Sequence, residues 1–257
     1  MTAPRIYRTE AIVLRHARYG EAGRLLTLFT PSYGKLRVVA KGVLRPTSHL
    51  AGHLELFSHT SLLIARTRTL DIVSQAQTME SFPAIREDLG KVSSALYMAE
   101  LLERLSEERA ENYPSYQLLL AALEWLSTAA AQDLPMRFFE MRLLEITGYR
   151  PELYVCLRCK QQLAQVLNAF SGTAGGTLCA QCAVGELDAR PLSVNALKVL
   201  RLLQRGETAD IRRLLLDVPV ARELEQHMRY YLPHVTDREL RSAAFVEAVR
   251  ATQPGPR

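Results

Sequence analysis

The sequence lacks long apolar runs and the short signatures by which many enzymes are recognised. No stretch of about 18 consecutive apolar residues occurs, so a membrane-spanning helix is not expected. The phosphate loop G-x-x-x-x-G-K-[ST], the G-x-S-x-G turn and the H-E-x-x-H metal motif are all missing. The six histidines are scattered and have no obvious partner for acid–base work. We therefore expect a protein without enzymatic activity, and a hydrolase or ligase with an unrecognised site is the weakest alternative.

Cysteine is also scarce, and the four cysteines of the chain form two matched pairs. Cys156 with Cys159 and Cys179 with Cys182 give the spacing C-x2-C-x19-C-x2-C. Each pair can bind one side of a tetrahedral metal ion, and four thiolates favour a single structural Zn²⁺ with no open position for catalysis. The alternatives are two local disulfides or one redox-active pair. Residues 1–8 lack the apolar segment of a signal peptide, so we expect a cytoplasmic, reducing environment that disfavours disulfides.

The positive charge of the chain is concentrated in its first third. The 257 residues are 48% hydrophobic and 23% charged, which is ordinary for a globular protein, and the net charge is +5. Residues 1–80 contain eleven Lys or Arg and five acids, or +6, whereas the remaining residues sum to −1. This asymmetry predicts a polyanionic partner, most commonly a nucleic acid. An acidic protein tail, membrane headgroups or a merely solvated basic face are the alternatives.

Residues 1–80 have the composition of a small β domain. Branched and aromatic residues predict five strands, at 10–16, 24–30, 35–41, 53–67 and 70–78. Turn-forming clusters separate the strands, and Gly34 is expected to supply the positive φ of a hairpin. A closed barrel leaves no unpaired sheet edge, so five short strands favour an OB-fold over an open sheet.

From residue 83 onward the apolar residues recur at helical spacing. Helices are predicted at 83–107, 114–131, 135–147, 193–204, 219–232 and 237–250. Gly148 is expected to end the third helix, and Ser193 to cap the fourth. Thr236 and Glu239 form a capping-box pattern before the last helix.

These patterns predict an α+β protein with several parts. The parts are an OB-fold domain at 1–80, a helical domain at 81–150 and 191–250, a four-cysteine zinc-finger insertion at 151–190, and a flexible tail at 251–257. The insertion is too short to bury a core of its own, and a metal crosslink compensates for that deficit. The expected metal cluster is anionic and few basic residues lie near it in the sequence, so a structural or protein-docking role suits it better than DNA binding.

The strongest nucleic-acid-binding candidates lie in the predicted third strand and just after it. They are Lys35, Arg37, Lys41 and Arg45. Alternate residues of a strand lie about 6–7 Å apart on one face, which suits the phosphates of a nucleic-acid strand. Further candidates around the first turn are Arg15, Arg18 and Arg24. Tyr19 and Tyr33 lie in turns and could stack on bases, or could instead pack on the barrel.

Several blocks of this sequence resemble the bacterial RecO recombination mediators. The segment Tyr19 to Thr30 is similar to the family's opening strand-turn-strand. Pro31 to Leu36, then Ala40-Lys41-Gly42 and Arg45 with Ser48, are similar to the block that follows it. The cysteine pairs after a helical stretch are similar to the zinc-bearing branch, and the order of parts agrees across nearly the whole chain.

The resemblance implies a function without catalysis. It implies an OB-fold that binds single- and double-stranded DNA, the annealing of complementary strands, and help in loading the RecA recombinase onto strands covered by single-stranded-DNA-binding protein. RecR is the implied partner, and no membrane is involved. Lys35, Lys41 and Arg45 lie in the matching block and carry over as DNA contacts, and the implied location is the nucleoid. The alternative is a zinc-stabilised protein-interaction scaffold with no DNA activity of its own.

Overall fold

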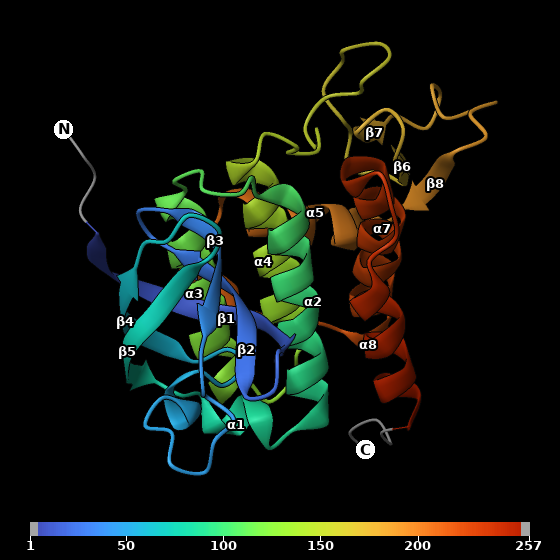
Figure 1. Ribbon diagram of the computed structural model, residues 1–257. Coiled ribbons are helices and arrows are strands. Elements are labelled where there is room, and N and C mark those ends of the chain that lie inside the picture. The colour runs from blue at the N-terminus through green and yellow to red at the C-terminus, as the bar shows by residue number, and fades with distance from the viewer. Residues whose placement is uncertain (1–4, 253–257) are drawn as a thin grey trace. The chain divides into compact units, whose positions relative to one another are not determined.

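The structure is a computed structural model that describes residues 5–252 (Figure 1). The chain divides into two compact units. One contains residues up to Thr128 together with the chain from Val249 onward, and the other contains Ala129–Ala248. The first unit combines the strands of the N-terminal part with the helices that follow them. The domain boundaries predicted from the sequence stay a prediction.

A closed five-stranded barrel forms the N-terminal part of the first unit. Its strands are β1 (Ile6–Tyr19), β2 (Gly23–Thr30), β3 (Gly34–Ala40), β4 (His59–Ala65) and β5 (Asp71–Glu80), in the order β1-β2-β3-β5-β4. The long β1 pairs with β4 through its first half and with β2 through its second, with a register shift between Val13 and Arg15. A short parallel pairing of β3 with β5 closes the barrel. The predicted OB-fold is confirmed.

The alternation of β3 fixes which of its side chains face the barrel interior. Leu36, Val38 and Ala40 belong to the buried core, so the intervening residues face outward. The turn before β3 requires glycine, because Gly34 has a φ of +57°. A Cβ at this position would lie 1.8 Å from the carbonyl oxygen of Ala110. The predicted positive φ of Gly34 is confirmed.

Three helices complete the first unit, in addition to the 3₁₀ turn η1 (Ala51–His53). They are α1 (Pro83–Arg86), α2 (Leu89–Leu105) and α3 (Tyr113–Thr128). Helix α2 packs against β1, and α3 packs against β2. The single helix predicted at 83–107 is wrong, because α1 ends at Arg86 and a new helix begins after Asp88. The Asp88 carboxylate accepts a hydrogen bond from the Lys91 N–H and so caps α2.

Besides most of the last helix of the chain, the second unit contains four helices and a small sheet among its described residues. They are α4 (Asp133–Ile146), α5 (Val194–Arg205), α6 (Thr208–Arg212) and α7 (Val218–Thr236), with β6 (Asn168–Ser171), β7 (Gly176–Leu178) and β8 (Ala189–Leu192) in the order β7-β6-β8. Helices α4, α5 and α7 pack against one another. Gly148 follows α4 with a φ of +83°, and the Ser193 hydroxyl caps α5 by accepting from the Ala196 N–H, as predicted.

The end of the chain differs from the prediction. Thr236 does not cap the last helix, because α7 extends to this residue and its hydroxyl donates to the Leu232 carbonyl. The last helix, α8 (Arg241–Thr252), begins five residues later. It includes the first two residues of the predicted tail, and residues 253–257 lie outside the described part. None of the described helices combines the length and the apolar character needed to span a membrane.

Candidate nucleic-acid interface and metal site

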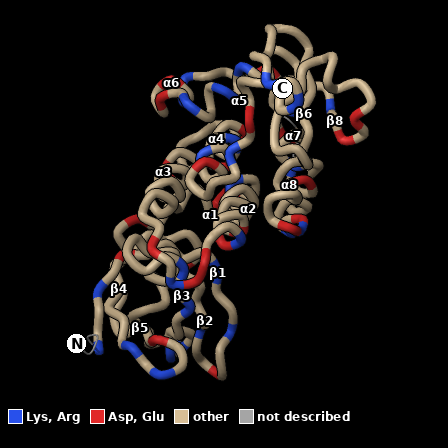
Figure 2. The backbone as a smooth tube through the Cα atoms, turned by 90° about the horizontal axis from the view of Figure 1, so that it is seen from above, with Lys and Arg blue, Asp and Glu red and all other residues tan. Residues whose placement is uncertain are grey.

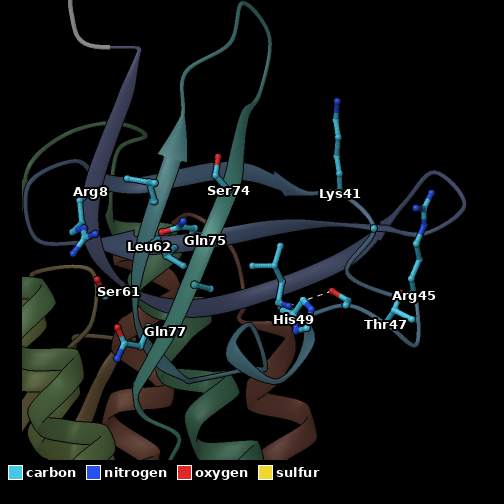
Figure 3. A pocket seen from close by; sticks show the side chains of 15 residues that line it. Arg8, Lys41, Arg45, Thr47, His49, Ser61, Leu62, Ser74, Gln75 and Gln77 are labelled. Carbon is cyan, nitrogen blue, oxygen red and sulfur yellow. Dashed lines mark hydrogen bonds between the residues drawn. The ribbon is translucent and has the colours of Figure 1, made fainter.

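A groove with a mixed polar and aliphatic lining lies on the outside of the barrel, over β4 and β5. Its volume is about 740 Å³. Ser61 and Leu63 of β4 and Ser74, Gln75 and Gln77 of β5 contribute to its floor. Arg8 lies on one side, whereas Lys41 and Arg45 lie on the other, on the loop that leaves β3 (Figure 3). We refer to this hollow as the barrel groove.

The loop between β3 and η1 is held in place as one wall of the barrel groove. The buried side chain of Val43 anchors it in the barrel core. Backbone hydrogen bonds join Leu44 N–H to the Ala22 carbonyl at 3.0 Å and Arg45 N–H to the Gly42 carbonyl at 3.1 Å. The backbone that carries Lys41 and Arg45 is therefore held in place without a ligand, which reduces the entropy lost on binding.

The cations of the barrel groove have no partner among the described residues. Arg8, Lys41 and Arg45 are exposed, and no hydrogen bond or ion pair joins their side chains to another residue within 5–252. No carboxylate is among the described residues that line the barrel groove. Figure 2 places Lys and Arg along the barrel strands and loops. The positive field in the barrel groove is not neutralised internally, so it favours an anion.

Lys35 lies in a different environment from Lys41. Its Nζ donates to the carbonyl oxygens of Glu103 and Ser106, each at 2.6 Å, at the C-terminal end of α2. These carbonyls lack helical partners, and a cation there is stabilised by the helix dipole. Lys35 thus joins β3 to α2, and its role as a DNA contact stays a prediction.

The cations predicted around the first turn also have partners within the first unit. Arg15 pairs with Glu103 at 3.4 Å, and Arg24 pairs with Glu55 at 3.1 Å. Arg18 donates to the carbonyl of Glu21 at 3.3 Å. None of these three residues lines the barrel groove.

Arg37, in contrast, is exposed on the outside of β3 and has no partner in the described part of the chain, but it does not line the barrel groove either. The structure thus places Lys41 and Arg45 at the barrel groove, whereas the other five predicted cations are not among its described lining residues.

The two tyrosines considered for base stacking lie outside the barrel groove. The Tyr33 ring packs against that of Tyr7, with 4.7 Å between ring centroids. Tyr7 is buried and its hydroxyl donates to Asp71 at 3.0 Å; burial, followed by this hydrogen bond, raises the pKa of Tyr7 well above its ordinary value. Tyr19 is 46% exposed, at the end of β1.

Arg8 is the cation of the barrel groove that the sequence reasoning missed. In β1 it is exposed between the buried Tyr7 and Thr9. This alternation was the available signal, because an arginine between two inward-facing residues of a barrel strand must face outward.

The four cysteine sulfurs come together in the second unit. The Sγ atoms of Cys156, Cys159, Cys179 and Cys182 all lie within 4.8 Å of one another. The Sγ atoms of Cys159 and Cys179 are 4.0 Å apart. A tetrahedral ion with metal–sulfur bonds of ~2.3 Å requires sulfurs separated by ~3.8 Å. The four-thiol donor set therefore fits one tetrahedral, thiophilic metal ion.

Backbone pairing brings the two cysteine loops side by side. The Thr177 N–H donates to the Glu152 carbonyl and the Leu157 N–H to the Thr177 carbonyl, each at 2.9 Å. A Cβ on Gly176 would lie 2.5 Å from the Glu152 carbonyl oxygen, so glycine permits this close approach. The segment before Cys156 and the segment before Cys179 thus lie side by side.

The thiols alone cannot all ionise in this arrangement. Burial raises the pKa of the Cys156 thiol. Hydrogen bonds from the backbone N–H groups of Cys159, Cys179 and Arg158 outweigh this effect and lower the pKa to about 6. The hydrogen bond with the Cys179 thiol raises the pKa of Cys182 to about 12. A bound cation would compensate the repulsion between four thiolates.

Comparisons with known proteins cover nearly the whole chain. Residues 1–82 match the family model described as Recombination protein O N terminal, and residues 86–244 match Recombination protein O C terminal. The chain belongs to the RecO family. The predicted resemblance is confirmed, and this family has a role in DNA repair and recombination.

Similar RecO proteins cover almost the full length of the chain. The DNA repair protein RecO of Roseiflexus sp. (strain RS-1) is 44% identical over 96% of this chain and 87% of that protein. Those of Dehalococcoides mccartyi (strain 195) and Desulforudis audaxviator are 37% and 39% identical, over 97% and 93% of this chain and 98% and 96% of their own length.

Proposed function

We propose that this RecO-family protein binds DNA in the barrel groove and anneals complementary strands without catalysing a reaction. The observation that carries the proposal is the set of three unpartnered cations, Arg8, Lys41 and Arg45, around a groove without carboxylates on an OB-fold. OB-folds bind single strands in cationic grooves with little sequence preference. Single-stranded DNA is the primary ligand, and double-stranded DNA offers the same phosphates.

Charge neutralisation provides the physical basis for annealing. Two complementary strands repel each other, and cations that contact their phosphates release condensed counterions and reduce that repulsion. The pairing itself supplies the free energy, so this step needs no nucleotide hydrolysis.

Within recombination, the proposed role is to help load RecA with RecR onto strands covered by single-stranded-DNA-binding protein. This assignment is supported by membership of the RecO family. We also propose a cytoplasmic, nucleoid-associated location and identify the ion of the four-cysteine site as Zn²⁺. That ion would bind Cys156, Cys159, Cys179 and Cys182 as a structural crosslink, with no position open for catalysis.

Fluorescence anisotropy of a labelled single strand, titrated with the protein at several salt concentrations, tests the proposal. We expect an affinity that falls steeply with salt, together with faster annealing of complementary oligonucleotides at low salt. Absence of salt-sensitive binding at any protein concentration would contradict the proposal. The scaffold alternative, in which the protein only assembles other proteins, would then be favoured.

A further inference from the structure

The barrel groove contains no aromatic platform on which bases could stack. None of the described residues that line it is Phe, Tyr or Trp, and its one ring is that of His49 on the loop. The aromatic residues of the barrel are used elsewhere: Phe29 and Phe57 are buried, and Tyr33 packs on Tyr7. Sites that hold bases of a single strand ordinarily stack them on such rings.

The polar groups of the barrel groove suit the sugar–phosphate backbone instead. Its floor presents the hydroxyls and amides of Ser61, Ser74, Gln75 and Gln77, which can donate to phosphate oxygens. Arg8 lies on the opposite side of this floor from Lys41 and Arg45 (Figure 3). A chain of phosphates between these walls would meet cations on both sides and no carboxylate.

Bases placed in the same groove would be poorly accommodated. The apolar part of the lining is aliphatic, with the half-buried side chains of Leu50 and Leu63 among its members, and offers a base no ring to stack on. A base inserted there would lose its hydration and gain no aromatic contact.

We infer that the barrel groove binds a single strand by its backbone alone, with the bases turned outward and their pairing edges free. This inference rests on the proposed DNA binding and specifies how the strand lies. A complementary strand could then pair with the bound strand while it remains on the protein, and base pairing would not require release.

Competition with two chemically altered strands tests the inference. A labelled natural single strand is bound to the full-length protein and displaced by unlabelled strands of equal length. One competitor has its bases replaced by abasic sites, and the other has neutral methylphosphonate linkages. We expect the abasic strand to compete within about threefold of the natural strand, because a stacked base would contribute about fivefold or more. The methylphosphonate strand should compete at least about tenfold less well, because its backbone releases no counterions.

The outcomes separate this inference from the proposed function. If the natural strand does not bind, the proposed function fails. If it binds and the abasic strand competes tenfold or more weakly, DNA binding stands and the backbone-only arrangement is overturned. The variants His49→Ala and Tyr19→Ala serve as controls, and we expect neither to change the ratio of natural to abasic affinity. A specific loss of natural-strand affinity in either variant would identify a stacking site and overturn the inference.

Discussion

The barrel groove and the four-cysteine site both bring together groups whose charge the protein does not compensate internally. The charge is positive in the groove and negative at the ionised cysteines. In the barrel groove, no carboxylate is among the described lining residues beside Arg8, Lys41 and Arg45, and these cations favour an anion. At the four-cysteine site, four sulfurs within 4.8 Å of one another favour the binding of a cation.

The two sites differ in what supports them. The barrel has its own apolar core, built from residues such as Leu28, Leu36 and Ile64, so it keeps its shape without a ligand. The cysteine loops depend on short strands of three or four residues and on the expected metal. Uncompensated charge of opposite sign marks the two sites, and we propose that its ligand is functional in the barrel groove and structural at the four-cysteine site.

Removal of the metal should produce the largest effect on stability. For Cys159→Ser with Cys182→Ser, we expect loss of the bound ion and a fall in the unfolding free energy of the second unit on the order of 5 kcal/mol. Single-strand affinity should stay within about twofold, because the barrel groove lies in the other unit. Metal content by mass spectrometry and thermal unfolding measure the first effect, and anisotropy measures the second. Arg158→Ala is the control that should keep the ion, and a tenfold loss of affinity in the cysteine variant would refute the separation.

Removal of the groove cations should produce the reverse pattern, a large loss of DNA affinity with little change in stability. Each phosphate contact contributes about fivefold at ~0.1 M salt, so Arg8→Ala with Lys41→Ala and Arg45→Ala should weaken single-strand binding about 100-fold. Thermal unfolding should change little, because these side chains have no partner within the described chain. The charge-matched control replaces Arg15, Arg18 and Arg37, which lie outside the barrel groove. Equal losses in the two triple variants would show that net charge, rather than the groove, determines affinity.

Lys35→Met tests whether Lys35 has a structural role or contacts DNA. Because Nζ donates to two carbonyls at the end of α2, we expect a loss of about 2 kcal/mol in unfolding free energy. DNA affinity should change by less than about twofold. Chemical denaturation and anisotropy on the same preparation test both expectations. An affinity loss with unchanged stability would instead support the DNA contact implied by the family resemblance.

Arg15→Ala should have the smallest effect. Its ion pair with Glu103 is 3.4 Å long and its side chain is 66% exposed, so it contributes at most about 0.5 kcal/mol. We expect near-unchanged stability and affinity by the same two measurements. A large affinity loss would extend the DNA-binding surface beyond the barrel groove.

Local patterns of the sequence predicted much of the fold. Turn residues and segments rich in branched side chains predicted the five-stranded barrel. The positive φ of Gly34 was predicted from its place in a turn. The short strands β6, β7 and β8 were missed, because three or four residues carry too little alternation to distinguish a strand from a loop. The break before α2 was missed because the apolar spacing continues across Asp88, whose capping hydrogen bond interrupts the helix.

The site was predicted less completely, because its members come together through long-range pairing. Lys41 and Arg45 were predicted as neighbours in sequence, whereas Arg8 joins them through the pairing of β1 with β4, in which it lies opposite Leu63. Lys35 has its partners 68 and 71 residues further along the chain. Charge along a single strand cannot distinguish a cation that has such a partner from one that has none.

The measurement that tests the central claim most directly is the slope of log affinity for a single strand against log salt, in wild type and in the Arg8/Lys41/Arg45→Ala variant. Three lost phosphate contacts, each contributing ~0.7 to the slope, should make the variant's slope about 2 less steep. Parallel lines for the two proteins would contradict the assignment of DNA binding to the barrel groove.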